Sequence, residues 1–173
     1  MRTLPLRSWL LFLAVLSALA FTAVSAFADG TEKLFFIQRS KNANEVHYDA
    51  RLTKDGALDP KNPVEGYWLN KAEDGSRNGI SLLQRVAYGY DTEPTGNGTY
   101  ALKLKAFKDR PMWIVKARGH WRVQTTIAGK QAFMNRLYVA TDEGGIIPKV
   151  LFVDVFGEDM ATGAAISEHI VKK

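Results

Sequence analysis

The chain has 173 residues, no cysteine and a formal net charge of +5. The lack of cysteine excludes disulfides, thiol catalysis and cysteine-ligated zinc. Two of the positive charges, Arg2 and Arg7, precede the first acidic residue, and the balance beyond them is +5 − 2 = +3. Such a mild charge argues against a nucleic-acid-binding protein, which needs clustered cations.

The first 28 residues have the pattern of a secretory signal peptide. Arg2 and Arg7 precede an apolar run from Trp9 to Val24, and Ala26-Phe27-Ala28 matches a cleavage site. A membrane anchor is the alternative, but the run is shorter than the roughly 20 residues that a spanning helix needs. We expect cleavage after Ala28, which leaves a single domain over 29–173 with no stable membrane span, in the periplasm or secreted.

Alternation of apolar and polar residues predicts strands along most of the remaining chain. In the first half, strands are expected over 33–39, 45–52 and 64–70. The first two are joined by the turn-forming residues 40–44, which predicts a hairpin. The third follows the loop 59–63, whose two prolines remove backbone donors.

The segment 80–89 contains the one predicted helix. Its apolar residues recur at helical spacing, Asn78 is a candidate N-cap, and Gly89 is a candidate end. Two helical turns are marginal alone, so the apolar face of this helix is expected to pack against the rest of the domain.

Further strands are expected over 100–107, 112–127, 131–141, 150–157 and 164–171. The run 112–127 is too long for one ordinary strand, so we expect a bend, bulge or tight turn at Gly119. The segment 150–157 is almost wholly apolar, which predicts burial of both its faces. A glycine loop over 141–147 precedes it.

These roughly eight to ten short strands with one short helix predict an all-β fold. Hairpin-length connections favour antiparallel pairing. Closure into a barrel would limit exposed strand edges, so an antiparallel β-barrel is the first expectation and a β-sandwich is the alternative.

Three local patterns give the chain a family resemblance. They are SKNANxVxY at 40–48, DPKNPVxxYW at 59–68 and AYGY at 87–90, with a less specific ending of FG at 156–157 and TG at 162–163. The chain resembles the uncharacterised bacterial exported family known as domain of unknown function 4833, over most of 33–171. The resemblance implies a bacterial envelope or secreted location and supplies no activity, substrate or catalytic residue.

The asparagine loops and their neighbouring aromatics form the first candidate site. Amide side chains offer donors and an acceptor, while Tyr and Trp combine an apolar face with a polar tip, which suits a sugar or small polar ligand. The same residues also stabilise turns and cores, so a structural role is the alternative. The candidate ligand-binding residues of this set are Asn42, Asn44, Asn62, Tyr67, Trp68 and Tyr88.

A basic ladder is the second candidate. Arg118, His120 and Arg122 continue from Lys116 on one face of the run 112–127, provided that the strand is continuous. Such a row could meet phosphates or carboxylates. A solvated outer face is the alternative, and a turn at Gly119 would break the row.

Two weaker candidates rest on acidic residues. Glu45, His47 and Asp49 share one strand face and could hold a metal, although pairing with neighbouring cations is the simpler interpretation and no metal site is assigned. Asp154 lies within an apolar run, where a carboxyl group would be either buried with a raised pKa, paired with a cation or turned outward.

The sequence therefore favours an exported, non-catalytic β-domain that binds a small molecule, glycan or envelope partner, with no cofactor. Its few serines lie in no nucleophile motif, so an enzyme is disfavoured and no catalytic residue is assigned. A protein–protein interaction module is the main alternative. A hydrolase that uses two carboxylates on envelope substrates is a further one.

Overall fold

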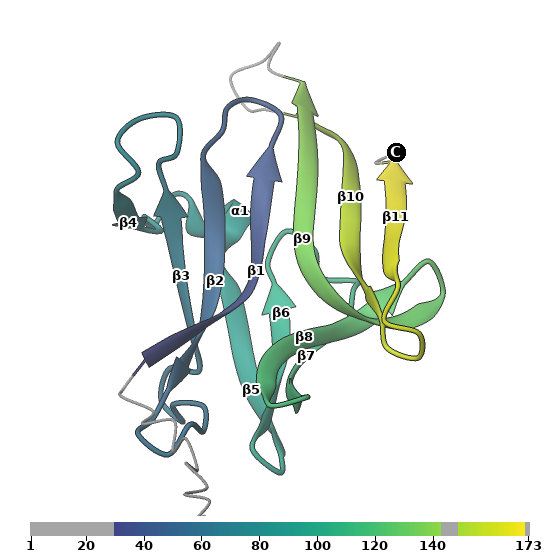
Figure 1. Ribbon diagram of the computed structural model, residues 1–173. Coiled ribbons are helices and arrows are strands. Elements are labelled where there is room, and N and C mark those ends of the chain that lie inside the picture. Colours follow the sequence, from purple (N-terminus) through teal and green to yellow (C-terminus); the bar gives the residue numbers. More distant parts are fainter. Residues whose placement is uncertain (1–29, 143–148, 172–173) are drawn as a thin grey trace, which may run out of the picture.

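The computed structural model describes residues 30–142 and 149–171 and contains eleven strands and one short helix, α1 (Figure 1). The elements of the first half are β1 (Gly30–Arg39), β2 (Glu45–Leu52), β3 (Val64–Leu69), β4 (Arg77–Gly79), α1 (Arg85–Tyr88) and β5 (Tyr90–Gly96). Those of the second half are β6 (Thr99–Leu104), β7 (Met112–Ala117), β8 (His120–Ile127), β9 (Lys130–Asp142), β10 (Lys149–Asp159) and β11 (Ala165–Val171).

All eleven strands belong to one mixed sheet, and β9 is the strand at which it branches. The order along one path is β4-β3-β2-β1-β9-β8-β7-β6-β5, while β10 pairs with the other edge of β9 and with β11. The first residues of β9 pair with β8, and residues 136–139 pair with β1. The β1–β9 pair is parallel, and all other pairs of strands are antiparallel.

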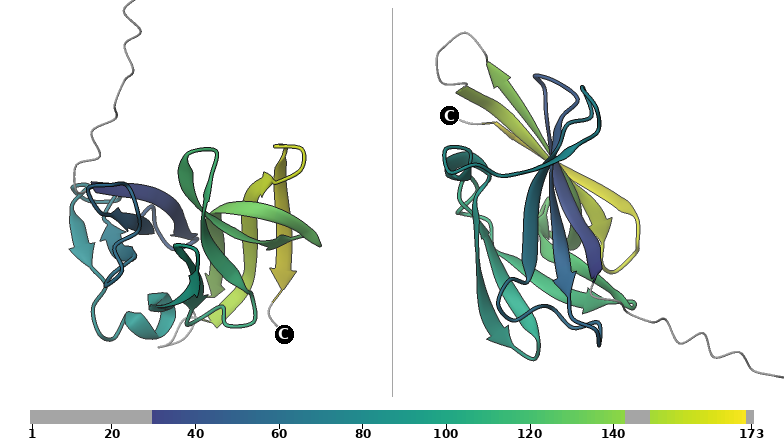
Figure 2. Two further views of the ribbon diagram at one scale, coloured as in Figure 1. Left: turned by 90° about the horizontal axis from the view of Figure 1, so that it is seen from below. Right: turned by 90° about the vertical axis from the view of Figure 1, so that its left-hand side faces the viewer.

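The sheet curls strongly into a half-barrel, so that β5 and β6 lie opposite β2 and β3 (Figure 2). Hydrogen bonds across the interior hold this curl. The Tyr48 hydroxyl donates to the Tyr88 carbonyl at 2.8 Å, and the Tyr90 hydroxyl donates to the Val64 carbonyl at 2.9 Å. The all-β prediction with barrel-like curvature is confirmed.

The core fills the concave side of the curled sheet. Its largest completely buried side chains are Tyr48, Leu102, Met112, Ile114, Ile127 and Met134. They come from five different strands, because each strand turns alternate side chains inward. The core therefore joins the first half of the sheet, β1–β4, to the second half across the interior.

The most strongly alternating segments are the best predicted. β2 spans Glu45–Leu52 as expected. The long run 112–127 is broken between β7 and β8 by the two residues Arg118 and Gly119, which both have positive φ, 51° and 85°. The turn expected at Gly119 is confirmed, since glycine adopts this left-handed conformation without steric cost.

Two strands and the helix differ from expectation. β4 and β5 were not predicted as strands. The helix is a single turn that begins after Gln84, so Asn78, which lies in β4, is not its N-cap. The expected packing of the apolar residues of 80–89 is wrong in part, because Ile80 packs against the core whereas Leu83 and Val86 are 84% and 75% exposed.

The predicted burial of both faces of 150–157 is wrong as well. In β10 the odd-numbered residues from Val153 onward are buried, whereas the even-numbered ones are half-buried and Leu151 is 45% exposed. The expected signal peptide 1–28 and residues 143–147 of the expected glycine loop lie outside the described residues.

Candidate functional site

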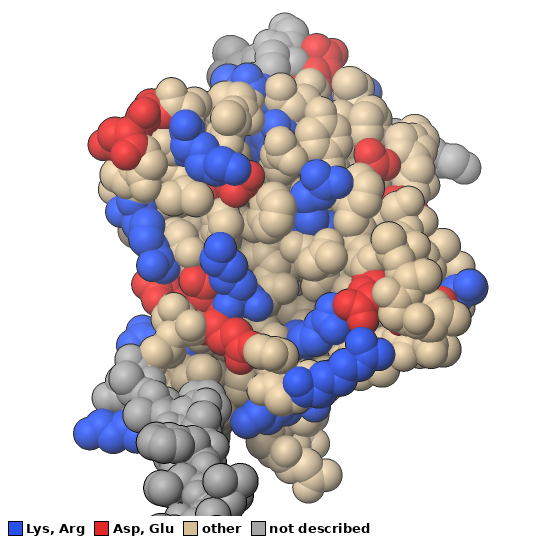
Figure 3. All heavy atoms as spheres, viewed as in Figure 1, with Lys and Arg blue, Asp and Glu red and all other residues tan. Residues whose placement is uncertain are grey.

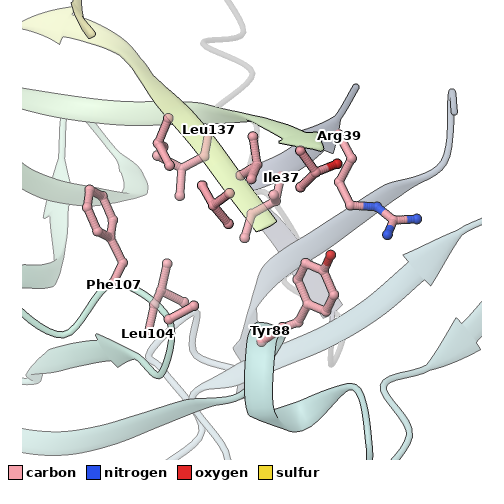
Figure 4. A pocket seen from close by; sticks show the side chains of 12 residues that line it. Ile37, Arg39, Tyr88, Leu104, Phe107 and Leu137 are labelled. Atoms are coloured by element: carbon pink, nitrogen blue, oxygen red, sulfur yellow. The ribbon is translucent and has the colours of Figure 1, made fainter. Parts of the chain in front are cut away.

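A cavity of about 340 Å³ lies between the inner face of the sheet and the segment around α1. Its apolar lining consists of Ile37, Ala87, Leu104, Ala106, Phe107, Leu137, Val139, Val150 and Val153, together with Arg39, Tyr88 and Thr141. Figure 4 shows Arg39 and Tyr88 at one end of this apolar cavity and Leu104, Phe107 and Leu137 toward the other.

A polar cleft of about 300 Å³ adjoins the apolar cavity and shares Arg39 and Tyr88 with it. The rest of its lining is Asn44, Trp68, Asn70, Asn78, Gly79 and Gln84. Amide side chains dominate this lining, and each amide offers two donors and an acceptor. The two hollows together thus pass from an apolar to a polar environment at Arg39 and Tyr88.

Strand register explains why the polar groups gather at one end of the inner face. Ile37, Val46, Trp68 and Asn78 form one row of paired residues across β1, β2, β3 and β4. Arg39 lies two residues beyond Ile37, so its side chain projects from the same face. The end of β1 therefore carries a cation beside the apolar cavity.

The side chains of Arg39 and Trp68 contact each other at this boundary. The Arg39 guanidinium carbon lies 5.0 Å from the centre of the Trp68 ring, and the Tyr88 ring meets Trp68 edge to face at 5.1 Å. Trp68 is only 7% exposed. Within the described residues, neither Arg39 Nε nor Trp68 Nε1 has a hydrogen-bond partner.

Tyr88 is held in place from the core. Its backbone carbonyl accepts the hydrogen bond from Tyr48, which is completely buried. Burial raises the pKa of Tyr48 far above its ordinary value of 10.0, so its hydroxyl remains a donor. The short helix α1 thereby keeps Tyr88 between the apolar cavity and the polar cleft.

Three of the six predicted asparagine and aromatic residues meet in the polar cleft, namely Asn44, Trp68 and Tyr88. Asn44 is buried, and its Oδ1 accepts a hydrogen bond from the Ala72 backbone at 2.8 Å, so it also holds the loop after β3. Asn42 accepts the backbone N–H of Asn44 at 3.2 Å, which is a local turn contact.

Asn62 lies elsewhere. It precedes Val64, which pairs with Ala50, whereas Asn44 lies next to the Glu45–Leu69 pair at the opposite end of the β2–β3 ladder. The two ends are separated by five residues, or roughly 17 Å at the rise of a strand. The first candidate site, which combined the two asparagine loops, therefore does not form as one pocket.

Tyr67 projects from the outer face of the sheet, away from Trp68. It lies in a stack in which the ring centres of Phe36 and His47 are 5.4 Å apart, those of His47 and Tyr67 are 5.5 Å apart, and Arg77 covers Tyr67 at 3.6 Å. Burial and the hydrogen bond that its hydroxyl donates to Asp49 at 2.9 Å raise the pKa of Tyr67 to about 12. These contacts give Tyr67 a structural role.

The acidic candidates Glu45 and Asp154 lie within ion-pair distance of a lysine or a histidine. Glu45 lies 2.8 Å from both His47 Nε2 and Lys71 Nζ. Burial alone would raise the pKa of Glu45, but the hydrogen bonds from Lys71 and His47 outweigh burial and hold it below 4.5. Asp154 is half-buried and lies 2.6 Å from His169 Nδ1 on β11.

The basic ladder is interrupted and already paired with acids. Arg118 Nη1 and Arg122 Nη2 lie 3.0 and 2.8 Å from the two carboxylate oxygens of Glu158, and His120 Nδ1 lies 2.6 Å from Glu32. Figure 3 shows basic side chains interspersed with acidic ones on the face it views. The three predicted residues therefore do not form an open row for an anion.

Glu158 allows a test of how the stability of the protein depends on pH. Its hydrogen bond from Arg122, with Arg118 nearby, holds the pKa of Glu158 below 4.5. A carboxyl group whose pKa is lowered by folding stabilises the protein above its ordinary pKa, and this contribution is lost as the pH falls through the folded value. We expect the melting temperature of Glu158→Gln to fall below that of the wild type at about pH 7, and we expect this difference to shrink as the pH falls below 4.5.

The matched control for Glu158→Gln is Glu93→Gln. Glu93 and Lys103 form an ion pair whose side chains are 63% and 57% exposed, and such pairs contribute little to stability. A melting-temperature difference for Glu158→Gln that does not change with pH would contradict the assigned role of its charge.

A family model for a domain of unknown function, DUF4833, matches residues 35–169. The chain belongs to this family. The match covers most of the DUF4833 domain described above, including both hollows and the residues that line them. No curated protein and no solved structure matches the chain. In the part of the DUF4833 domain that the structure describes, no helix has the length and apolar character needed to cross a membrane.

Sequence reasoning missed Arg39, the one charged residue in the described lining of the two hollows. Arg39 ends a predicted strand, and such a position is usually solvated. One signal was available, since Arg39 continues the alternation of Phe35 and Ile37 and therefore shares their inward face.

Proposed function

We propose that the domain is an exported, non-catalytic protein that binds a small molecule with a largely apolar body. The observation that carries this proposal is the apolar cavity of about 340 Å³, which falls within the range of roughly 300–1,000 Å³ typical of small-molecule sites. Such sites combine apolar walls with a few polar groups that orient the ligand. The polar cleft supplies these groups through its amides and Arg39.

The lining argues for binding and against hydrolysis. The described residues of the apolar cavity and the polar cleft include no Asp or Glu, so this site lacks the paired acids that a carboxylate-dependent hydrolase needs. Thr141 carries the one aliphatic hydroxyl among them, and it lies within hydrogen-bonding distance of the Ser40 hydroxyl, 3.4 Å away.

Binding of N-phenyl-1-naphthylamine, a neutral apolar dye that fluoresces when it leaves water, tests this proposal. We expect the full chain to bind the dye with saturation. We expect Ala87→Trp to weaken binding about tenfold or more, because Ala87 lines the cavity and a larger side chain there would occupy it.

The adjacent substitution Val86→Trp is the matched control. Val86 is 75% exposed and does not line the cavity, so this variant should bind the dye like the wild type. Equal loss of binding in both variants, or no saturable binding by the wild type, would contradict the proposal.

A protein-interaction module is the second candidate function. It is favoured by three apolar side chains next to the site, because Leu82, Leu83 and Val86 are 81%, 84% and 75% exposed. Clustered exposed apolar side chains are a feature of interaction surfaces.

A further inference from the structure

The boundary between the apolar cavity and the polar cleft has unused hydrogen-bond donors. Arg39 Nε and Trp68 Nε1 are buried and have no hydrogen-bond partner within the described residues. The two side chains lie against each other, with the Arg39 guanidinium carbon 5.0 Å from the centre of the Trp68 ring. Buried donors are nearly always paired in folded proteins, so two unpaired ones at the same boundary indicate a missing acceptor.

Within the described residues, the positive charge at this boundary is also uncompensated. The described lining of the two hollows holds one cation, Arg39, and no carboxylate. Among the described residues, no acidic group lies within the 4.0 Å of Arg39 that would define an ion pair. Every other arginine assigned to the candidate sites, Arg118 and Arg122, is paired with an acid.

The surroundings strengthen the attraction of Arg39 for an anion. Its neighbours are the rings of Trp68 and Tyr88 and the apolar wall of the cavity, which lower the local dielectric. A guanidinium can bind a carboxylate through two parallel hydrogen bonds. The indole N–H of Trp68 adds a donor that has no acceptor in the part of the chain that the structure describes.

We infer that Arg39 and Trp68 form an anion subsite, and that the ligand is an amphipathic monoanion with a carboxylate at one end of an apolar chain or ring. The carboxylate would lie at Arg39, and the apolar body would extend toward Leu104, Phe107 and Leu137 (Figure 4). This inference rests on the proposed function, since it names the chemical class of the molecule in the same cavity.

Displacement of N-phenyl-1-naphthylamine by decanoate and by 1-decanol tests the anion subsite separately from the proposed function. The two competitors share the same apolar chain and differ in charge. We expect decanoate to bind the wild-type chain about tenfold tighter than decanol, as a charge-assisted bidentate pair would give.

Decyl phosphate is the third competitor and distinguishes a carboxylate from a phosphate head. Binding of decyl phosphate tighter than that of decanoate would replace the carboxylate by a phosphate and overturn the assigned class.

The substitution Arg39→Met keeps an unbranched apolar side chain and removes the charge. In this variant we expect decanoate to lose about tenfold in affinity while decanol and the dye bind as before, which also shows that the variant is folded. Arg51→Met is the matched control. It removes the same charge from the exposed residue Arg51 at the far end of β2 and should leave the decanoate preference unchanged.

Trp68 provides an independent readout. The indole N–H resonance of Trp68, assigned through its loss in Trp68→Phe, is expected to move on addition of decanoate and to remain in place with decanol. Equal affinities of decanoate and decanol in the wild type would overturn the anion subsite and leave the proposed function standing. Failure of the dye and of all three competitors to bind would overturn the proposed function itself.

Discussion

Replacing Gly157 by alanine is expected to lower the free energy of unfolding by about 3 kcal/mol, at the upper end of the usual cost of overpacking. Gly157 lies on β10 where the pairing with β9 shifts register after Phe156. A Cβ atom at Gly157 would collide with the backbone carbonyl of Phe133 and would lie 2.7 Å from Ile127 Cδ1. The Phe133 carbonyl is part of the β9 backbone, so relief requires the two strands to separate.

Urea denaturation followed by tryptophan fluorescence measures this effect. Gly79→Ala on β4 is the matched control, because a Cβ atom at Gly79 would meet no heavy atom within 4 Å. That variant should unfold like the wild type. If Gly157→Ala were also within about 0.5 kcal/mol of the wild type, the close approach of β9 and β10 described here would be incorrect.

The second large effect is expected at Tyr48. Its ring is completely buried, stacks on Phe35 with ring centres 4.5 Å apart, and meets Tyr90 edge to face at 5.7 Å. Tyr48→Ala should therefore lower the free energy of unfolding by about 4 kcal/mol, in line with other aromatic truncations in cores. Tyr48→Phe keeps the ring and should cost about 1–2 kcal/mol, because the Tyr88 carbonyl loses its donor.

Tyr48→Phe also links stability to the candidate site. Loss of the hydrogen bond to Tyr88 removes one of the contacts that hold α1 on the core, so we expect weaker binding of N-phenyl-1-naphthylamine together with the lower stability. Tyr138→Phe is the control, since Tyr138 is half-buried and its hydroxyl has no hydrogen-bond partner among the described residues. Unchanged stability in Tyr48→Phe would show that this hydroxyl does not hold α1.

Strands whose conformation is encoded by local sequence signals were predicted, and strands that depend on pairing with their neighbours were not. β2 has a clean alternation, and Gly119 marks a turn that only a few residue types accept, so both were predicted from local signals. β4 has the sequence Arg-Asn-Gly, and β5 contains Pro94, so neither carries a strand signal. Their conformation comes from pairing with β3 and β6 at the edges of the sheet.

The site was less predictable than the fold for a similar reason. Asn44, Trp68 and Tyr88 were recognised by residue type, but Asn62 and Tyr67 belong to another end and another face of the same strands. The apolar cavity depends on the parallel pairing of β1 with β9, which no short-range pattern in the sequence encodes. Arg39 borders the apolar cavity through that pairing, whereas Trp68 reaches Arg39 through the pairing of β1, β2 and β3.

The pairing of β1 with β9 also sets the order in which the chain can complete its fold. Ser40 and Thr141, whose hydroxyls lie 3.4 Å apart, are 101 residues apart in sequence. As synthesis proceeds from the N-terminus, β1 to β4 can form local hairpins. The edge of β1 that faces β9 stays unpaired until the last third of the chain has been made. Contacts of such long range make folding slow. A nascent chain stalled before β9 would expose unpaired backbone groups along β1, to which a strand of another chain could pair.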